Sequence, residues 1–590
     1  MMLALACGRE QAPLNRQSQS EISAADVKYH VNYLASDSLE GRLSGTVGGE
    51  AAAKYIAAEF KRFDLKPIAE GGSYFQNFDF IGGVKLGANN RMAIEGRTDT
   101  LIVGKDFIPA GFSDSGEVSG ALAFVGYGIS APQQNYDDYA GIEVKDRIVI
   151  ALRYSPDAKN PHGALKPMEA LRYKTLQARE HGAKVLLIVT GPEDDPEDAL
   201  PQLRYDRSSG DAGLMVAHVT RTVADVLLAS SGQRIAALQQ AINTSRSPKS
   251  MLIDGKAMLA IDVVKEQRWA ANLVGLLEGS DATLKNEYVV IGAHYDHLGR
   301  SSEGAMDPEK VNEIHNGADD NASGTASVLE LAQYFSAQAE KPKRSLLFIT
   351  FSGEELGLLG SAHYVASPLK PLSSTVAMIN MDMIGRLKDS TLVVEGIGTS
   401  PSWAEMIERL NRNYGFQVRL KKDGYGPSDH ASFYNKNIPV LFFFTNLHED
   451  YHRISDDAEK INATGEATIV RMVADVVTEV ANASSTPQFT KASPDSQPQG
   501  RSFRVSVGTI PDYAAEADGM QISGVRPSSP AEKAGLQGGD IIIKFGEYDI
   551  KNVYDYTYAL DSFNPGDEVE IVALRAGQKM TVKAKLEGRR

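Results

Sequence analysis

The sequence predicts an α/β fold in which a mostly parallel, mixed sheet is flanked by helices. Apolar runs at residues 289–293, 346–351 and 376–381 are typical of buried strands. Amphipathic helical patterns lie between and after these runs, for example over residues 325–339 and 404–414. Such alternation indicates strands joined by crossover helices. A β-rich insert before this region and a compact β unit after it complete the predicted architecture.

Length, composition and charge limit the classes of function. At 590 residues the chain is too long for one hydrophobic core, so we expect several domains. The net charge of -15 argues against a nucleic-acid partner, which would need a basic face. No stretch approaches the ~20 apolar residues that span a bilayer, so no transmembrane span is expected.

The only cysteine, Cys7, lies in a short segment of apolar and small residues. This segment resembles the end of a bacterial lipoprotein signal, in which a cysteine is lipidated and becomes the N-terminus. Residues 1–22 would then be signal and tether, and the protein would be exported to the periplasm or held at a membrane by a lipid on Cys7. The alternative is a frayed cytosolic N-terminus.

Residues 23–95 are expected to form the N-terminal part of the main domain. Apolar residues recur at helical spacing over residues 23–65, interrupted by a glycine-rich joint that begins Leu39-Glu40-Gly41-Arg42. Residues 96–260 have a different pattern, with short strands at 118–127, 147–152 and 185–189 and a helix at 171–182. No residue of this insert belongs to a metal-binding or nucleophilic constellation. Its segments 125–129 and 146–149 resemble the protease-associated (PA) domain, which is usually non-catalytic.

The main domain resumes at residues 261–482, and a Ser-, Pro- and Gln-rich linker follows at 483–502. Residues 503–590 carry the signature Ala534-Gly535-Leu536 followed by a Gly-Gly-Asp turn. This signature resembles a PDZ domain of the bacterial periplasmic-protease type. The resemblance implies that an edge strand accepts a peptide C-terminus. It also places four residues near the carboxylate-binding loop: Val505, Ser506, Val507 and Gly508. The alternative is a scaffold PDZ domain without a ligand.

Each apolar run of the main domain leads to a side chain that can bind a metal. Because ligands bind beyond the carboxyl ends of parallel strands, these side chains are expected to converge. The set comprises His294, Asp320, Glu355, Asp382 and His452. Two imidazoles and three carboxylates without a thiolate suit two divalent ions, most readily Zn²⁺, while Co²⁺ or Mn²⁺ would also be tolerated.

Three local patterns assign further roles. His294 and Asp296 share one face of an extended strand, so Asp296 can accept the second imidazole N–H and orient the ligand. Glu354 and Glu355 are adjacent and point in different directions, so one can bind metal while the other faces an attacking water. Asp320 lies in a tight polar loop where its carboxylate can bridge two ions, although its neighbour Asp319 is an alternative bridge.

The motifs His-x-Asp, Gly-Ala-Asp-Asp-Asn, Glu-Glu-x-Gly-Leu, Asn-Met-Asp and Tyr-His, in this order, resemble the M28 family of dizinc aminopeptidases. The resemblance implies that His294 and Asp382 hold one zinc and that Glu355 and His452 hold the other. Asp320 would bridge the two ions and Glu354 would be the general base. It further implies a cis peptide bond after Asp320. From its position we also expect Asp456 to be a partner of His452.

Pocket residues are less well defined by the sequence. Asp429 and His430 lie in a Ser-Asp-His motif that recurs in the family near the site, and His430 either lines the pocket or braces the substrate. Tyr425 and the aromatic residues 442–444 either shape an apolar pocket or pack in the core. Four other histidines are interpreted as loop or structural residues rather than ligands: His297, His315, His363 and His448.

The sequence favours an aminopeptidase that removes N-terminal residues from peptides. The predicted carboxylates would attract a free α-ammonium group, whereas a carboxypeptidase would need an arginine clamp. Two alternatives differ in metal content. A glutaminyl cyclase-like enzyme would bind one zinc, and a non-catalytic protein that binds peptides through its PDZ and PA modules would bind none.

Overall fold

The computed structural model describes residues 21–588 except for 157–163, 206–211, 302–303, 308–309, 311, 493–504, 513–516, 527–528, 562 and 564. The predicted lipidation site, Cys7, and most of the predicted linker therefore lie outside the described residues. The chain divides into two compact units, one of residues 1–78 and 270–495 and the other of residues 79–269 and 496–590. Each unit is described separately below.

The first unit is built on a mixed sheet whose described strands run in the order β1-β12-β14-β13-β15-β18-β16-β17, with β2 also paired to β12. Strands β14, β13, β15 and β18 are mutually parallel, whereas β12 and β16 pair antiparallel with their neighbours β14 and β18. The strands are β1 (Lys66–Pro67), β2 (Phe75–Leu86), β12 (Val263–Leu277), β13 (Tyr288–His294), β14 (Ser345–Phe351), β15 (Thr375–Met381), β16 (Thr391–Glu395), β17 (Gln417–Leu420) and β18 (Val440–Phe444). Strands β2 and β12 contain the two boundaries at which the chain leaves and re-enters this unit.

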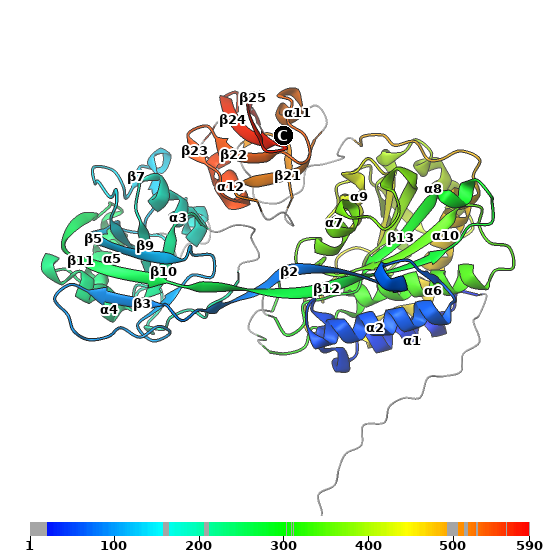
Figure 1. Cartoon of the computed structure of the whole chain (residues 1–590), viewed down its shortest axis with the longest axis horizontal. Coiled ribbons are helices and arrows are strands. Elements are labelled where there is room, and N and C mark those ends of the chain that lie inside the picture. The colour runs from blue at the N-terminus through cyan, green and yellow to red at the C-terminus, as the bar shows by residue number, and fades with distance from the viewer. Residues whose placement is uncertain are drawn as a thin grey trace, which may run out of the picture. The chain divides into compact units, whose positions relative to one another are not determined.

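Helices cover both faces of this sheet (Figure 1). They are α1 (Ala24–Leu34), α2 (Val47–Arg62), α6 (Gly324–Ala337), α7 (Leu359–Ala366), α8 (Trp403–Asn411), α9 (His430–Tyr434) and α10 (Ala463–Asn482). Alternate residues of β13 point to opposite faces: Val289 and Ile291 join the core formed with α6 and α10, whereas Val290 joins the core formed with α7 and α9. Because both faces are covered, all seven residues of β13 are buried, as expected for a parallel strand.

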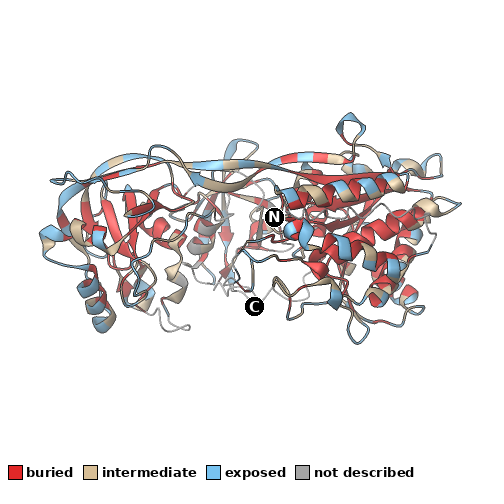
Figure 2. Cartoon of the chain, turned by 90° about the horizontal axis from the view of Figure 1, so that it is seen from below, coloured by how far each residue is buried: buried red, intermediate tan, exposed pale blue. Residues whose placement is uncertain are grey.

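Burial within this unit follows the same plan (Figure 2). Figure 2 shows buried residues along the strands and exposed residues on the outer faces of the helices. The carboxyl ends of β13, β14 and β15 lie side by side, since His294 is in register with Phe351 and Gly292 with Asn380. The residues that follow these three strands therefore meet at one edge of the sheet.

The glycine-rich joint between α1 and α2 forms a tight turn in the structure. Glu40, Gly41 and Arg42 all have positive φ angles, of 47°, 70° and 52°. A Cβ atom on Gly41 would lie 2.3 Å from the carbonyl oxygen of His315, so only glycine fits there without movement. The joint therefore packs closely against the loop that precedes Asp320.

The second unit contains another mixed sheet, in the order β3-β11-β5-β8-β9-β10-β4. Strands β5, β8, β9 and β10 are parallel, and helices α3, α4 and α5 accompany them. Its elements are β3 (Arg91–Ile94), β4 (Phe107–Pro109), β5 (Gly116–Phe124), β6 (Ser130–Ala131), β7 (Tyr136–Asp137), β8 (Ile148–Leu152), β9 (Val185–Val189), β10 (Met215–Val219), β11 (Met251–Ile261), α3 (Leu171–Glu180), α4 (Arg221–Leu227) and α5 (Ile235–Ser245).

The C-terminal segment of the second unit is mainly β structure. A sheet joins β20, β21, β22, β24 and β25 in that order, with β23 paired to β22, and β19 pairs separately with β26. The elements are β19 (Val505–Ser506), β20 (Thr509–Pro511), β21 (Met520–Val525), β22 (Ile541–Phe545), β23 (Tyr548–Asp549), β24 (Glu568–Arg575), β25 (Gln578–Lys585), β26 (Glu587–Gly588), α11 (Pro530–Lys533) and α12 (Val553–Asp561).

The predicted fold class is confirmed: a mostly parallel mixed sheet with helices on both faces, together with a sheet-containing insert and a C-terminal β domain. One expected boundary differs. Strand β3 lies before residue 96 but pairs with β11 of the insert sheet, so the insert begins earlier than its composition indicated. Among the described residues, no helix combines the length and the apolar character needed to cross a bilayer.

Candidate metal centre

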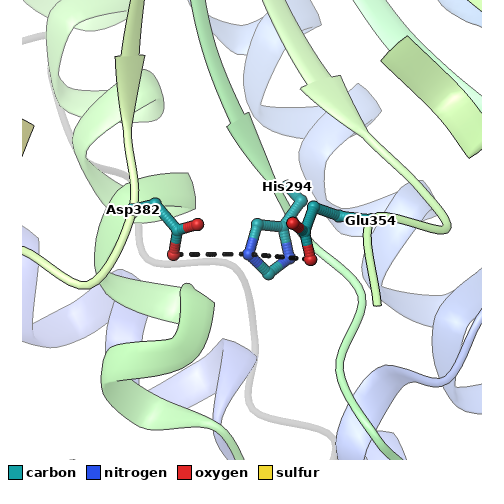
Figure 3. Close-up of side chains that lie close together, drawn as sticks. All are labelled: His294, Glu354 and Asp382. Carbon is teal, nitrogen blue, oxygen red and sulfur yellow. Dashed lines mark ion pairs between the residues drawn. The ribbon is translucent and has the colours of Figure 1, made fainter. Parts of the chain in front are cut away.

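Three side chains from adjacent strand ends converge at the edge of the first sheet (Figure 3). His294 ends β13, Glu354 follows β14, and Asp382 follows β15. The Nε2 atom of His294 lies 3.4 Å from Oδ1 of Asp382 and 3.9 Å from Oε2 of Glu354. Oδ1 of Asp382 is buried and has no hydrogen-bond donor within the described residues. These three residues form one group that can hold a metal ion.

A second set of side chains lies around Asp320, whose two carboxylate oxygens have different neighbours. Oδ2 of Asp320 is 3.2 Å from Nε2 of His452, and that nitrogen is 3.3 Å from Oε2 of Glu355. Oδ1 of Asp320 is 3.4 Å from Nε2 of His294. The two oxygens of one carboxylate therefore face two different sets of ligand-type atoms. All five predicted ligands lie together.

The loop that carries Asp320 is held by its backbone. One oxygen of Asp456 accepts hydrogen bonds from the N–H groups of both Asp319 and Asp320, at 2.9 and 3.1 Å. The peptide bond between Asp320 and Asn321 is cis, which confirms that prediction. Asp319 points away from the ligand atoms, since its carboxylate accepts from Gly385 N and lies 3.1 Å from Nε2 of His448.

The expected pairing of Asp456 with His452 is wrong. Nδ1 of His452 lies 2.8 Å from the carbonyl oxygen of Gly304, and its Nε2 faces Asp320 and Glu355. A carbonyl accepts only from an N–H, so this contact favours the tautomer in which Nε2 keeps a free lone pair. Loop 304–307 was not identifiable as a partner from the sequence, because nothing local marks a carbonyl as an acceptor.

Asp296 acts differently from the expectation. Nδ1 of His294 is within hydrogen-bond distance of the main-chain carbonyl of Asp296, at 3.1 Å, whereas the nearer carboxylate oxygen is 3.8 Å away. That carboxylate oxygen instead accepts from the N–H of Glu354 at 3.2 Å. Asp296 therefore orients His294 through its backbone and Glu354 through its side chain.

The sequence predicts a structural role for His297, whereas the structure places it against the proposed ligand Glu355. Its Nδ1 atom lies 2.6 Å from Oε1 of Glu355, and the ring is fully buried. His297, Asp320 and Glu355 form a second group with metal-binding geometry. The signal available in the sequence was its spacing of three residues from His294, which placed it in the same loop.

The adjacent glutamates have opposite electrostatic environments. Burial raises the pKa of Glu354 well above its usual range, and the negative charges of Glu355, Asp382 and Asp429 add to this effect against the opposing charge of His294. Burial also acts on Glu355, but His297 and His452 outweigh it and hold the pKa of Glu355 well below its usual range. Glu354 is thus suited to exchange a proton, whereas Glu355 is suited to remain anionic.

The two ligand-type histidines also face negative charge. Burial opposes the protonation of His294, but Asp382 and Glu354 raise its pKa well above the usual value. Burial has the same opposing effect on His452, while the adjacent carboxylates of Asp320 and Glu355 raise the pKa of His452 to about 11. A set of carboxylates that stabilises cationic rings in this way also favours a bound cation.

Of the predicted pocket residues, Asp429 is the one whose charge acts directly on the first ligand group. Asp429 is fully buried, and burial raises its pKa to about 7. The ring of His430 stacks on Phe442 with centroids 4.5 Å apart, and burial lowers its pKa to about 3. Tyr425 packs edge-on against Tyr434. His430 and Tyr425 thus have packing partners of their own, whereas Asp429 adds a carboxyl group near Glu354 and Asp382.

The predicted PDZ residues have mainly structural contacts. Val505 and Val507 are buried in the core of the C-terminal domain, and Ser506 is in β19, paired with β26. The carbonyl of Val507 accepts from Ala531 N, and Gly508, with φ of 83°, accepts from Arg526 N. Strand β20, which follows Gly508, pairs with β21 and ends the sheet within the described residues.

Comparison with known proteins identifies two domains. Residues 272–477 match the sequence model of Peptidase family M28, and residues 500–586 match that of the PDZ domain. The chain therefore contains a peptidase domain of family M28 and a C-terminal PDZ domain. The M28 match contains all five predicted ligands and Glu354.

Individual relatives match part of the chain. Leupeptin-inactivating enzyme 1 of Streptomyces exfoliatus is 29% identical over 44% of this chain and 58% of its own length. Leucine aminopeptidase 1 of Coccidioides posadasii is 29% identical over 36% of this chain and 54% of its own. The chain thus spans somewhat more than half the length of these relatives. A solved zinc aminopeptidase from Bacillus subtilis aligns with 79% of this chain and 97% of its own, at 22% identity and a TM-score of 0.48.

Proposed function

We propose that this chain, which contains an M28 peptidase domain, is a zinc-dependent aminopeptidase that uses two metal ions. His294 and Asp382 would hold one ion, Glu355 and His452 the other, and Asp320 would bridge them. The observation that carries this proposal is the orientation of Asp320. Its two carboxylate oxygens face His294 and His452 separately, at 3.4 and 3.2 Å.

The distances within each ligand set support ion binding. Two ligands of a tetrahedral zinc ion, each at the usual 2.0–2.1 Å, are separated by about 3.3 Å. The four closest contacts among the proposed ligands are 3.2, 3.3, 3.4 and 3.4 Å. Direct hydrogen bonds between charged groups are shorter, at about 2.7–2.9 Å. The residues therefore fit an ion between them better than direct pairing.

The same criterion argues against His297 as a ligand. Its Nδ1 atom is only 2.6 Å from Oε1 of Glu355, which is a hydrogen-bond distance and too short for two atoms that share a tetrahedral ion. We assign His297 the role of a hydrogen-bond partner that fixes the orientation of Glu355. Such partners of ligands tune both geometry and affinity.

Hydrolysis would then depend on Glu354. When bound, the ions would supply Lewis acidity that polarises the scissile carbonyl and acidifies the attacking water. Glu354 would take the proton of this water and deliver it to the departing amine, which its raised pKa favours. The N–H of Glu354 donates to Asp296, so the residue's backbone is fixed next to the ligands.

The charge around the first ligand group favours a substrate with a free N-terminus. Glu354, Asp382 and Asp429 place three carboxyl groups near His294. An α-ammonium group would find opposite charge there, whereas an α-carboxylate would be repelled. We therefore assign cleavage at the N-terminal end of peptides.

Hydrolysis of matched peptides tests this function. We expect cleavage of aminoacyl peptides, no cleavage of the same peptides after N-acetylation, and loss of cleavage on chelation that zinc restores. Equal cleavage of the acetylated peptides would contradict the aminopeptidase assignment. Cleavage that chelators do not affect would contradict the metal-dependent mechanism.

The PDZ domain is proposed to bind a peptide C-terminus along β20, which directly follows Gly508 and lies at one of the two edges of its sheet within the described residues. Binding of a fluorescent C-terminal peptide library to the whole protein would test this.

We also propose export with lipid attachment at Cys7, which lies outside the described residues. Loss of radiolabelled palmitate on Cys7→Ala substitution would support it, and unlabelled wild-type protein would contradict it.

A further inference from the structure

Arg42 is a fully buried arginine in the joint between α1 and α2. Its guanidinium donates to four main-chain carbonyls. The Nε–H bonds Tyr295 O at 2.8 Å, Nη1 bonds Leu34 O at 2.5 Å and Asn316 O at 2.6 Å, and Nη2 bonds Gly317 O at 2.9 Å. A planar guanidinium with five N–H donors can satisfy four acceptors at once, which a lysine cannot do.

Three of the four acceptors belong to the loops that carry the proposed ligands. Tyr295 lies between His294 and Asp296 at the end of β13, and Gly317 lies three residues before Asp320. These two loops are separated in sequence, and one side chain from a third segment connects them. Leu34, at the end of α1, ties the same guanidinium to the N-terminal helix.

The backbone around Arg42 contacts these loops as well. The N–H of Gly299 donates to the carbonyl of Gly41 at 3.1 Å, and Gly41 lies against His315. The hydroxyl of Ser44 is 2.7 Å from that of Ser352, two residues before Glu354. Segment 41–44 therefore contacts three loops: the one that follows β13, the one that precedes Asp320 and the one that follows β14.

Arg42 also places a positive charge near the carboxylates of the proposed metal centre. Burial lowers the pKa of Arg42 to about 10, while Asp296, Asp320, Asp456 and Glu355 act to raise it, so the side chain is charged at neutral pH. Each of its four hydrogen bonds goes to a carbonyl. The charge is therefore fixed by the backbone and is not neutralised by a hydrogen-bonded carboxylate partner of its own.

We propose that Arg42 is a positioning residue for the metal centre: it fixes the loops of His294 and Asp320 relative to each other so that Asp320 can reach both ligand groups. This inference rests on the proposed function. It assigns an active-site role to a segment about 250 residues away from the ligands in sequence. Loss of Arg42 should weaken metal binding more than a general loss of stability can explain.

A matched control is available in the same unit. Arg344 is also fully buried, with 1% of its surface exposed. It donates to the carbonyls of Val480 and Ala483 and to the carboxylate of Glu287. None of these partners is in a loop that carries a proposed ligand, so Arg344→Met should disturb packing without changing the metal centre.

The experiment compares full-length wild type with Arg42→Met, Arg42→Lys and Arg344→Met. Zinc affinity is measured by competition with a chromophoric chelator. The absorption spectrum of the cobalt-substituted protein reports ligand geometry, and thermal unfolding of the metal-free proteins reports stability. We expect Arg42→Met to bind zinc about 10–100-fold more weakly and to change the cobalt spectrum. Arg42→Lys should have intermediate zinc affinity, because it keeps the positive charge but loses the planar guanidinium that bonds four carbonyls at once.

The outcomes separate the inference from the proposed function. Arg344→Met should lose thermal stability yet keep wild-type zinc affinity. Wild-type affinity and spectrum in Arg42→Met, or an equal loss of affinity in Arg344→Met, would overturn the role of Arg42. If Arg42→Met does not fold, wild-type zinc affinity in Arg42→Lys would overturn it. Wild-type protein that binds no zinc would instead contradict the proposed function.

Discussion

The two units contain similar sheets, but different residues stand at the carboxyl ends of their central strands. In each unit, parallel apolar strands lie at the centre of a mixed sheet and are buried by helices: β13, β14 and β15 in the first, and β8, β9 and β10 in the second. The first set leads into His294, Glu354 and Asp382, whereas the second leads into Arg153, Thr190 and Thr220. Within the described residues, groups with metal-binding geometry occur only in the first unit.

This difference shows that the scaffold alone does not determine the chemistry. A parallel sheet brings strand ends together, and the residues at those ends decide whether a site forms there. Both units also bury a basic side chain that donates to main-chain carbonyls. Lys174 donates to the carbonyls of Tyr127, Leu152 and Tyr154 in the second unit, as Arg42 does in the first. Only Arg42 lies next to ligand loops.

The largest expected effect is on Glu354. Replacing it with glutamine removes the proposed proton acceptor but keeps the size of the side chain. We expect kcat to fall by about 10²–10⁴-fold with bound zinc unchanged. Steady-state kinetics and metal analysis of the same preparation would measure both quantities. Hydrolysis at the wild-type rate would rule out Glu354 as the general base.

The next largest effect compares the two sheets directly. Ile291 of β13 and Ile150 of β8 are both fully buried. Each substitution to alanine should cost about 2–5 kcal/mol of stability, because it leaves a cavity. Only Ile291→Ala should also weaken zinc binding, since β13 carries His294. Equal zinc affinity in the two variants would show that the ligand loops are insensitive to their strands.

A smaller effect is expected at His297. His297→Leu removes the hydrogen-bond partner of Glu355 and should weaken the binding of one zinc ion by about 10–100-fold. His363→Leu, at a partly exposed position on α7 outside the proposed ligand groups, is a control for the loss of a histidine elsewhere in the unit. Complete absence of that ion in zinc titrations would indicate that His297 is itself a ligand, and unchanged affinity would remove it from the centre.

The smallest effect concerns a histidine of the second unit. His218 of β10 is buried, and burial together with the charge of Arg153 lowers its pKa to about 3. An unfolded histidine has a pKa near 6.5, so between about pH 3 and 6.5 the unfolded chain binds an additional proton. Stability should therefore fall as the pH drops below 6.5, by at most about 1.4 kcal/mol per pH unit.

His218→Leu should abolish this contribution. Unfolding midpoints of the metal-free proteins, measured between pH 5 and 7.5, should decrease less steeply on acidification in the variant than in the wild type. Parallel profiles would mean that folding does not lower the pKa of His218.

Much of the first unit follows from local patterns. The buried runs of β13, β14 and β15 and the five proposed ligands could be identified because they are properties of short segments. The roles of Arg42, His297 and Asp456 could not, because each depends on contacts with loops distant in sequence. Backbone acceptors, such as the carbonyls of Asp296 and Gly304, leave no residue-specific signal. The start of the insert sheet at β3 was missed for the same reason, since only pairing with β11 reveals it.

The central claim is a two-ion centre bridged by Asp320. Zinc per chain, measured by mass spectrometry on protein equilibrated with zinc and freed of excess, tests it most directly. We predict two ions in the wild type and at most one in Asp320→Ala, with the Asp319→Ala variant less affected. One ion or none in the wild type, or two in Asp320→Ala, would contradict the account.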